Sequence, residues 1–118
     1  MDNKEHVRRL LEQAKQALRV EDSIKLLLYP MKYKVASISL KTKTIRINKN
    51  LINIFDDEEL YYILVHELIH LKIVSLSHGE SFYKLLNMLF SPNKSEEIEN
   101  KIIKKLLEIG INTKRWLT

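Results

Sequence analysis

The stretch LYYILVHELIHL, residues 60–71, decides the fold of this chain. Nine of its twelve residues are apolar, and the other three are His66, Glu67 and His70. On a helix of 3.6 residues per turn, side chains four positions apart lie one above the other, so both imidazoles project from one face. Glu67 lies about 100° around the helix from His66, on the flank of that face. The stretch therefore predicts a long buried helix that carries a small polar cluster.

This polar cluster needs a partner. A carboxylate and two imidazoles within an apolar helix raise the free energy of the fold unless something satisfies them. A Zn²⁺ ion would do so, because His66 and His70 can ligate it while Glu67 acts on a water molecule. The alternative is an accidental cluster in which each histidine is a hydrogen-bonded core residue. The pattern His-Glu-x-x-His on a helix is typical of zinc metallopeptidases, and this context favours the zinc interpretation.

A third metal ligand has to come from outside the helix, because a catalytic zinc ion has three protein ligands and one open position for water. His78 is the best candidate, since it follows His70 by eight residues at the bend where the helix ends. A helix cap or a solvated turn residue is the alternative role for His78. Further candidates for the third ligand are the acidic residues Glu80, Glu96, Glu97 and Glu99.

Length and composition restrict the class of protein. The chain has 118 residues, and we expect a single domain over residues 1–118 with one hydrophobic core. The apolar fraction of 45% and the charged fraction of 30% are typical of globular proteins. No cysteine is present, which excludes disulfides and cysteine-ligated zinc. The N-terminal residues do not resemble a signal peptide and no apolar run is long enough for a membrane span, so we expect a cytoplasmic protein.

The net charge of +5 permits nucleic acid or acidic surfaces as partners. Several cations lie together on a predicted hairpin: Lys41, Lys43, Arg46 and Lys49. We favour edge protection as their role, because exposed lysines prevent association between sheets. A contact with nucleic acid is the alternative, but aromatic residues for base stacking are not interleaved with these cations.

Periodicity predicts an α+β fold. The expected order is a helix over residues 3–20, about three strands, the long helix and two further helices before a C-terminal tail. The strands are expected at Lys25–Tyr29, 33–40 and Thr44–Asn48, with the last one half-buried and antiparallel. The long helix should begin at an Asp56 or Asp57 cap and run to about Leu76. The further helices are expected over 80–90 and, capped by Asn93, over 94–109.

The motifs around the histidines resemble a known group of peptidases. His66-Glu67-Leu68-Ile69-His70, followed by His78-Gly79-Glu80-Ser81-Phe82-Tyr83, is similar to the pattern His-Glu-Leu-x-His and His-[Gly/Ser]-x-x-Phe-[Trp/Tyr] of SprT-like and related small metallopeptidases. Tyr83 stands where related domains often have tryptophan. In length and element order the chain most resembles the minigluzincins, small zincin-like peptidases similar to the catalytic domains of integral-membrane gluzincin peptidases.

The resemblance implies a zinc metallopeptidase with His66, His70 and His78 as metal ligands and Glu67 as general base. It also implies that a strand before the long helix, at 44–48 or 33–40, lies beside the active-site cleft. We expect a peptide or protein substrate, bound extended along the sheet edge. The oxyanion-stabilising group stays open among Tyr61, Tyr62, Tyr83, His6 and Arg115.

The resemblance also implies latency, because C-terminal segments keep members of this family inactive. We therefore expect a zymogen in which Arg115 or Trp116 fills the cleft. Two rival functions remain. One is a non-catalytic zinc-binding protein, and the other is a nucleic-acid-associated protein of the SprT type.

Overall fold

The computed structural model describes residues 3–32 and 34–111. It has an α+β fold, as the sequence predicts. The elements in chain order are α1 (Asn3–Leu18), β1 (Lys25–Tyr29), β2 (Ala36–Ser39), β3 (Thr44–Asn48), a 3₁₀ turn η1 (Ile52–Ile54), α2 (Asp57–Ile73), α3 (Glu80–Leu89) and α4 (Pro92–Glu108). Within these described residues, no helix is both long and apolar enough to cross a membrane.

The strands form one sheet in the order β1-β3-β2. β3 pairs in parallel with β1 and antiparallel with β2, so β3 is central and β2 is an edge strand. The register aligns Leu26, Ile45 and Ile38 in one row across the sheet. All three side chains in this row are buried, which gives the sheet one continuous apolar face.

The antiparallel pairing expected for β3 is confirmed with β2, whereas β1 is a parallel partner that periodicity did not predict. The expectation that β3 is only half-buried is wrong, because Thr44 and Asn48 on its polar face are buried and Arg46 is partly buried. Asn48 shows how this face is satisfied. Its side-chain amide donates to the carbonyl oxygens of Met31 and Lys34, both at 2.8 Å. The loop between β1 and β2 is thereby fastened over the end of β3, and Asn48 is buried.

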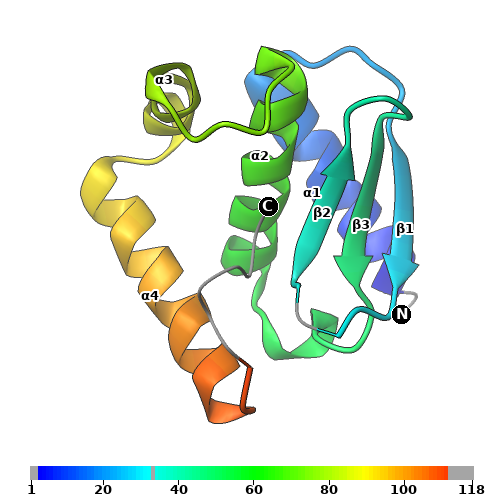
Figure 1. The fold of residues 1–118 in the computed structure, drawn as a ribbon, viewed down its shortest axis with the longest axis vertical. Coiled ribbons are helices and arrows are strands. Elements are labelled where there is room, and N and C mark those ends of the chain that lie inside the picture. The colour runs from blue at the N-terminus through cyan, green and yellow to red at the C-terminus, as the bar shows by residue number, and fades with distance from the viewer. Residues whose placement is uncertain (1–2, 33, 112–118) are drawn as a thin grey trace.

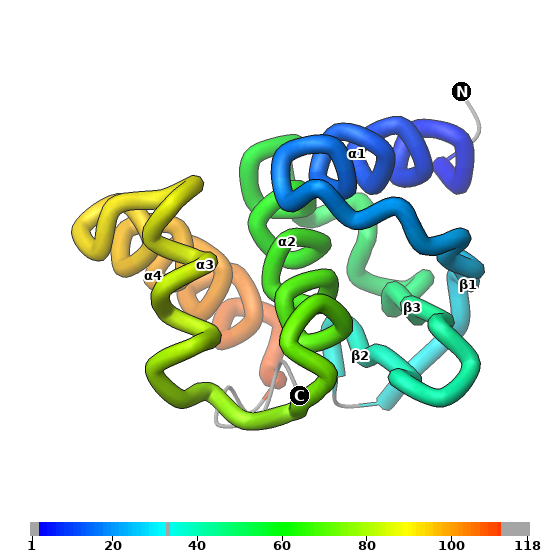
Figure 2. Tube along the Cα trace, turned by 90° about the horizontal axis from the view of Figure 1, so that it is seen from above, coloured from blue at the N-terminus to red at the C-terminus, as the bar shows by residue number. Residues whose placement is uncertain are grey.

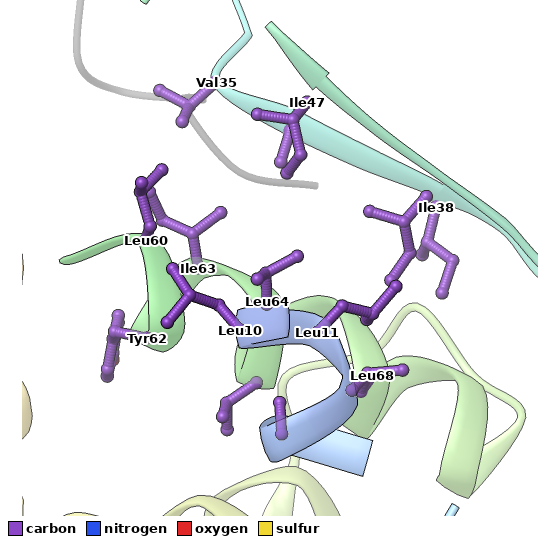
Figure 3. Close-up of a cluster of buried hydrophobic side chains, with 14 of the residues drawn as sticks. Leu10, Leu11, Val35, Ile38, Ile47, Leu60, Tyr62, Ile63, Leu64 and Leu68 are labelled. Atoms are coloured by element: carbon purple, nitrogen blue, oxygen red, sulfur yellow. The ribbon is translucent and has the colours of Figure 1, made fainter. Parts of the chain in front are cut away.

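α2 lies in the middle of the structure (Figures 1 and 2). The sheet lies on one side of α2, α3 and α4 lie on the other, and α1 packs against both α2 and the sheet. Figure 3 shows Val35, Ile38 and Ile47 directed from the sheet toward α1 and α2. Since α2 is enclosed by apolar neighbours on both sides, its polar residues lie in the interior of the molecule rather than at its surface.

α2 begins and ends at well-defined caps. The Asp56 side chain accepts a hydrogen bond from the Glu59 N–H, and the Glu59 side chain accepts one from the Asp56 N–H, both at 2.8 Å. This capping box selects Asp56 of the two predicted caps. At the other end the helix stops at Ile73, because Val74 adopts a left-handed conformation with φ 53° and ψ 46°. The prediction that the helix continues to Leu76 is therefore wrong.

Three polar contacts between described residues attach α4 to α2, and the outermost is the ion pair of Lys94 with Glu58 at 3.3 Å. The Tyr62 hydroxyl donates a hydrogen bond of 2.8 Å to the Glu99 carboxylate. Lys105 forms a short ion pair with Glu59, whose side chain is buried. α4 itself begins earlier than predicted, because Ser91 caps it and Pro92 takes its first position. The N–H that proline lacks would have no partner within the helix at that position. The predicted Asn93 cap is therefore wrong.

Candidate metal centre

His66, His70 and His78 converge on one point. One ring nitrogen from each histidine lies within 4.8 Å of those of the other two, and no other such group of histidine or acidic ligands exists among the described residues. The ring centroids are 4.8–5.1 Å apart. α2 supplies the first two rings from one face, as the spacing predicts, and the loop between α2 and α3 supplies the third.

The left-handed turn at Val74 positions this loop. It reverses the chain so that the Ser75 N–H donates to the His70 carbonyl oxygen at 3.1 Å. The Ser75 carbonyl oxygen then lies 2.9 Å from His70 Nδ1. A carbonyl oxygen only accepts hydrogen bonds, so Nδ1 carries the proton and His70 Nε2 keeps its lone pair. That lone pair faces His78 Nε2 at a distance of 3.0 Å.

His66 is held in the neutral form. Its side chain is 7% exposed, and burial lowers the pKa of His66 well below its usual value. The positive charge that His70 and His78 can carry lowers the pKa of His66 further. Its Nδ1 is buried without a hydrogen-bond partner among the described residues. A neutral imidazole is the form that binds a metal ion.

Phe82 forms the floor of the cluster. Its ring centroid lies 4.8 Å from His66, 4.9 Å from His70 and 4.8 Å from His78. The residue is buried and comes from the first turn of α3, one turn after His78. The sequence places Phe82 on the apolar stripe of this helix, but only the structure shows that a single ring orients all three imidazoles.

Glu67 lies beside the histidines and has no solvent exposure. Its Oε1 is 3.9 Å from His66 Nδ1. His70 is fully buried as well, whereas His78 is exposed. The residues that α2 contributes to the cluster are therefore shielded from solvent, and the exposed member is His78 of the loop.

The other candidate ligands do not join this group. Glu80 is the first residue of α3 and is exposed. Glu97 pairs with Lys94 and Lys101 at 3.6 and 3.7 Å, and Glu99 accepts the Tyr62 hydroxyl hydrogen bond. Glu96 is exposed on α4. His78 is the candidate that the structure brings to His66 and His70.

The candidates for oxyanion stabilisation lie at different places. His6 pairs with Asp57 at 2.7 Å, at the opposite end of α2 from His70. Tyr62 is buried on the same face as His66, one turn earlier, and burial together with the neighbouring Glu99 charge raises the pKa of Tyr62. Tyr61 packs near Phe90. Arg115 and Trp116 lie outside the described residues.

Tyr83 packs on the ring that contacts the three histidines. Its ring lies 5.4 Å from that of Phe82, and about half of the residue is exposed. Tyr83 therefore combines solvent access with a contact to the residue behind the histidine cluster.

The cations of the basic hairpin are not part of the histidine cluster. Lys43 at its turn pairs with Asp22 at 2.6 Å, and the hydrogen bond and charge of Lys43 lower the pKa of Asp22. Lys41 and Lys43 occupy the turn rather than the outer edge of β2. Whether these cations protect the sheet or bind a polyanion stays a prediction.

Similar proteins agree with this geometry. A protein of Methanocaldococcus jannaschii whose function is uncharacterised is 45% identical over 106 residues, which are 90% of this chain and 96% of that protein. The crystal structure of the metallopeptidase zymogen of M. jannaschii jannalysin superposes with a TM-score of 0.80 at 46% identity, over 85% of this chain and 96% of that one. The zymogen of Pyrococcus abyssi abylysin superposes with a TM-score of 0.80 at 37% identity, over 86% and 95%.

These matches extend the resemblance of the two histidine motifs to nearly the whole chain. The family model of the YgjP-like metallopeptidase domain matches residues 2–102, which include the three histidines and Glu67. The chain belongs to the YgjP-like metallopeptidase family and is a small α+β metallopeptidase of the minigluzincin type.

Proposed function

We propose that this metallopeptidase is zinc-dependent, with His66, His70 and His78 as the metal ligands and Glu67 as the general base. The observation that carries the proposal is the convergence of three ring nitrogens within 4.8 Å beside a buried carboxylate. Three nitrogen donors and one open position are the ligand set of a catalytic zinc ion.

The residues fit a zinc ion in distance and in protonation. Two nitrogens bound tetrahedrally at zinc–nitrogen distances of about 2.0–2.1 Å lie about 3.3 Å apart. His70 Nε2 and His78 Nε2 are 3.0 Å apart, close to this value. The Ser75 carbonyl oxygen accepts a hydrogen bond from Nδ1–H of His70. Such a bond to the nitrogen that does not bind the metal orients a ligating imidazole.

Bound zinc would supply a Lewis acid that polarises the peptide carbonyl and makes water more acidic. The Glu67 carboxylate would take a proton from the attacking water and deliver it to the leaving amine, acting as general base and then as general acid. Burial beside His66 keeps this carboxylate near the reacting centre and restricts competing water. The substrate would be a peptide bond in an extended segment.

The outer edge of β2 is the proposed place for that segment. β2 pairs with β3 on one side, and no described strand pairs with its other side. Figure 1 shows β2 as the strand beside α2. The main-chain groups of an extended peptide can pair with such an edge, which would lay its carbonyl groups along α2.

Latency is part of the proposal. Glu67 and His70 have no solvent exposure, so neither water nor substrate reaches them in this conformation. The two similar solved structures are described as zymogens. Deleting residues 111–118 should therefore raise peptidase activity, and unchanged activity would argue against a latent form.

The test combines metal analysis with hydrolysis. The purified chain should contain one zinc ion per molecule, and Glu67→Gln should keep the zinc while hydrolysis of an unfolded protein substrate falls by about 10²–10⁴-fold. Glu80→Gln is the matched control, because Glu80 is exposed and near in sequence. If the Glu67→Gln variant cleaved peptides at the wild-type rate, Glu67 would not be the base.

A further inference from the structure

A cavity lies between α3 and α4. Its volume is about 290 Å³, and its polar lining consists of Tyr83, Asn87, Ser95, Glu96, Glu99 and Asn100. The cavity does not contain the histidines. The chemistry of its lining has no part in the mechanism above, so it calls for a separate explanation.

The negative charge of this groove is not compensated. Neither Glu96 nor Glu99 forms an ion pair with any residue of the described chain, although four lysines lie on the same helix. Glu97, which points away from the groove, is paired with Lys94 and Lys101 instead. Glu99 is partly fixed, because it accepts the hydrogen bond of the Tyr62 hydroxyl. The groove therefore presents two carboxylates within a chain whose net charge is +5.

A buried hydroxyl in the groove also lacks a partner. Ser95 is 6% exposed, and its Oγ forms no hydrogen bond. It lies near the Tyr62 phenol, whose pKa it lowers slightly against the larger effect of burial, but the geometry does not satisfy the hydroxyl. A buried polar group without a partner is costly, and Ser95 is one of the residues that line the groove.

The outer end of the groove is aromatic. Tyr83 is 51% exposed, and its ring can cover a cation from one side. Carboxylates, amide oxygens, a hydroxyl oxygen and an aromatic face together suit an organic cation with several N–H donors. The apolar part of the lining, Leu86, Pro92 and Ile103, suits the alkyl chain that carries a guanidinium or ammonium group.

We propose that the α3–α4 groove binds the side chain of an arginine or lysine residue of the peptide substrate. The proposal rests on the peptidase function proposed above. Tyr62 donates a hydrogen bond to Glu99 and precedes His66 by one helical turn of about 5–6 Å. Tyr83 packs against Phe82, which contacts the three histidines. A residue of an extended peptide spans about 3.3 Å, so a basic side chain in the groove would lie within a few residues of the scissile bond.

The first test uses small probes and needs no catalysis. Nα-acetylarginine amide should bind the full chain saturably, with NMR shifts at the side-chain amides of Asn87 and Asn100. The neutral isostere Nα-acetylcitrulline amide should bind at least tenfold more weakly. Glu96→Gln/Glu99→Gln should reduce arginine binding by tenfold or more, whereas the control Glu97→Gln should not.

The double variant should still fold, because the amide oxygen of glutamine at position 99 can accept the hydrogen bond of the Tyr62 hydroxyl. Glu96→Gln alone is a second variant at an exposed position. Equal binding of arginine and citrulline probes, or unchanged arginine binding in the double variant, would overturn the proposal.

The second test measures kcat/KM for two peptides that differ only in arginine or citrulline near the scissile bond. The wild-type chain should prefer arginine by at least tenfold, and Glu96→Gln should remove most of that preference. Both peptides are also tested on the chain that lacks residues 111–118, because the full chain is proposed to be latent. If neither form cleaves a peptide, the peptidase function fails and the probe titration alone decides the cation site. If spermidine binds the groove while peptides show no preference, the site belongs to a free polyamine and the substrate proposal is wrong.

Discussion

Ser75 is joined to His70 twice: its N–H donates to the His70 carbonyl oxygen at 3.1 Å, and its own carbonyl oxygen lies 2.9 Å from His70 Nδ1. The same residue therefore ends the helix and fixes the tautomer of one imidazole. Helix termination and ligand orientation are one event in this fold, and both depend on the left-handed residue between them, Val74.

Val74→Gly should stabilise the protein. A β-branched residue is strained at φ 53°, and the left-handed conformation costs a non-glycine residue about 1–2 kcal/mol. Glycine removes this strain but adds about 0.5–1 kcal/mol of backbone entropy. Val74 is 75% exposed, so little packing is lost. We expect the free energy of unfolding in urea to rise by about 0.5–1 kcal/mol.

Val74→Ala is the matched control, because alanine keeps the Cβ atom and most of the strain. It should leave the stability nearly unchanged. If the Val74→Gly variant unfolded at a lower urea concentration than the wild type, the valine side chain would stabilise the loop by a contact that outweighs its backbone strain.

Lys105→Met should destabilise the attachment of α4 to α2. It leaves the Glu59 carboxylate buried with only the Asp56 N–H as partner on its Oε1. Breaking a fully buried pair costs about 3–5 kcal/mol, and because Lys105 is partly exposed we expect about 1–3 kcal/mol. Glu59→Gln/Lys105→Met should recover part of the loss in a double-mutant cycle of urea unfolding. Additive effects of the two substitutions would mean that the pair contributes no coupling energy.

His78→Ala should weaken metal binding without weakening the apo fold. His78 is exposed, so its removal creates no cavity, whereas His66 and His70 belong to the core. With zinc at 100 times its dissociation constant, the wild-type chain should gain about 2.7 kcal/mol of stability, and chelation should remove this gain. The variant should show the melting temperature of the chelated wild type, with or without zinc. A full zinc-dependent shift in the variant would exclude His78 as a ligand.

Phe82→Leu should loosen the metal centre more than it unfolds the protein. The aromatic ring contacts all three imidazoles, and leucine cannot cover the same area. We expect about 1 kcal/mol of lost stability from the reduced packing, together with a zinc affinity at least tenfold lower. Leu86→Ala is the comparison, because Leu86 is the other buried residue of this helix and has no ring. It should cost about 2–5 kcal/mol in stability but leave zinc affinity unchanged when measured where the apo protein is folded.

The fold class and the histidine pair could be predicted because both depend on periodicity. The apolar density of residues 60–71 requires a buried helix, and spacing of four puts His66 and His70 on one face. His78 could be proposed from the bend that precedes it, but spacing alone could not exclude Glu80. Only the three-dimensional path of the loop, set by Val74, distinguishes them. The ligand and base roles of these residues, and a single domain over residues 1–118, stay predictions.

Other features were beyond reach of the sequence. No glycine marks position 74, so the apolar pattern continues to Leu76 and hides the end of the helix. The Ser75 carbonyl oxygen is a backbone atom that any residue would supply. Both Ser91 and Asn93 are residues that commonly cap a helix. α4 begins after Ser91, because proline favours the first helical position. The parallel pairing of β3 with β1 depends on contacts distant in sequence, which periodicity does not encode.

The central position of β3 has a consequence for how the chain acquires its structure. β3 is the last of the three strands to be synthesised, and β1 and β2 have no pairing between them. No part of the sheet can form until residues 44–48 have left the ribosome, and α2 follows within about ten residues. Pairing of the sheet and formation of the helix that bears the histidines therefore both wait for residues that are close together in the chain.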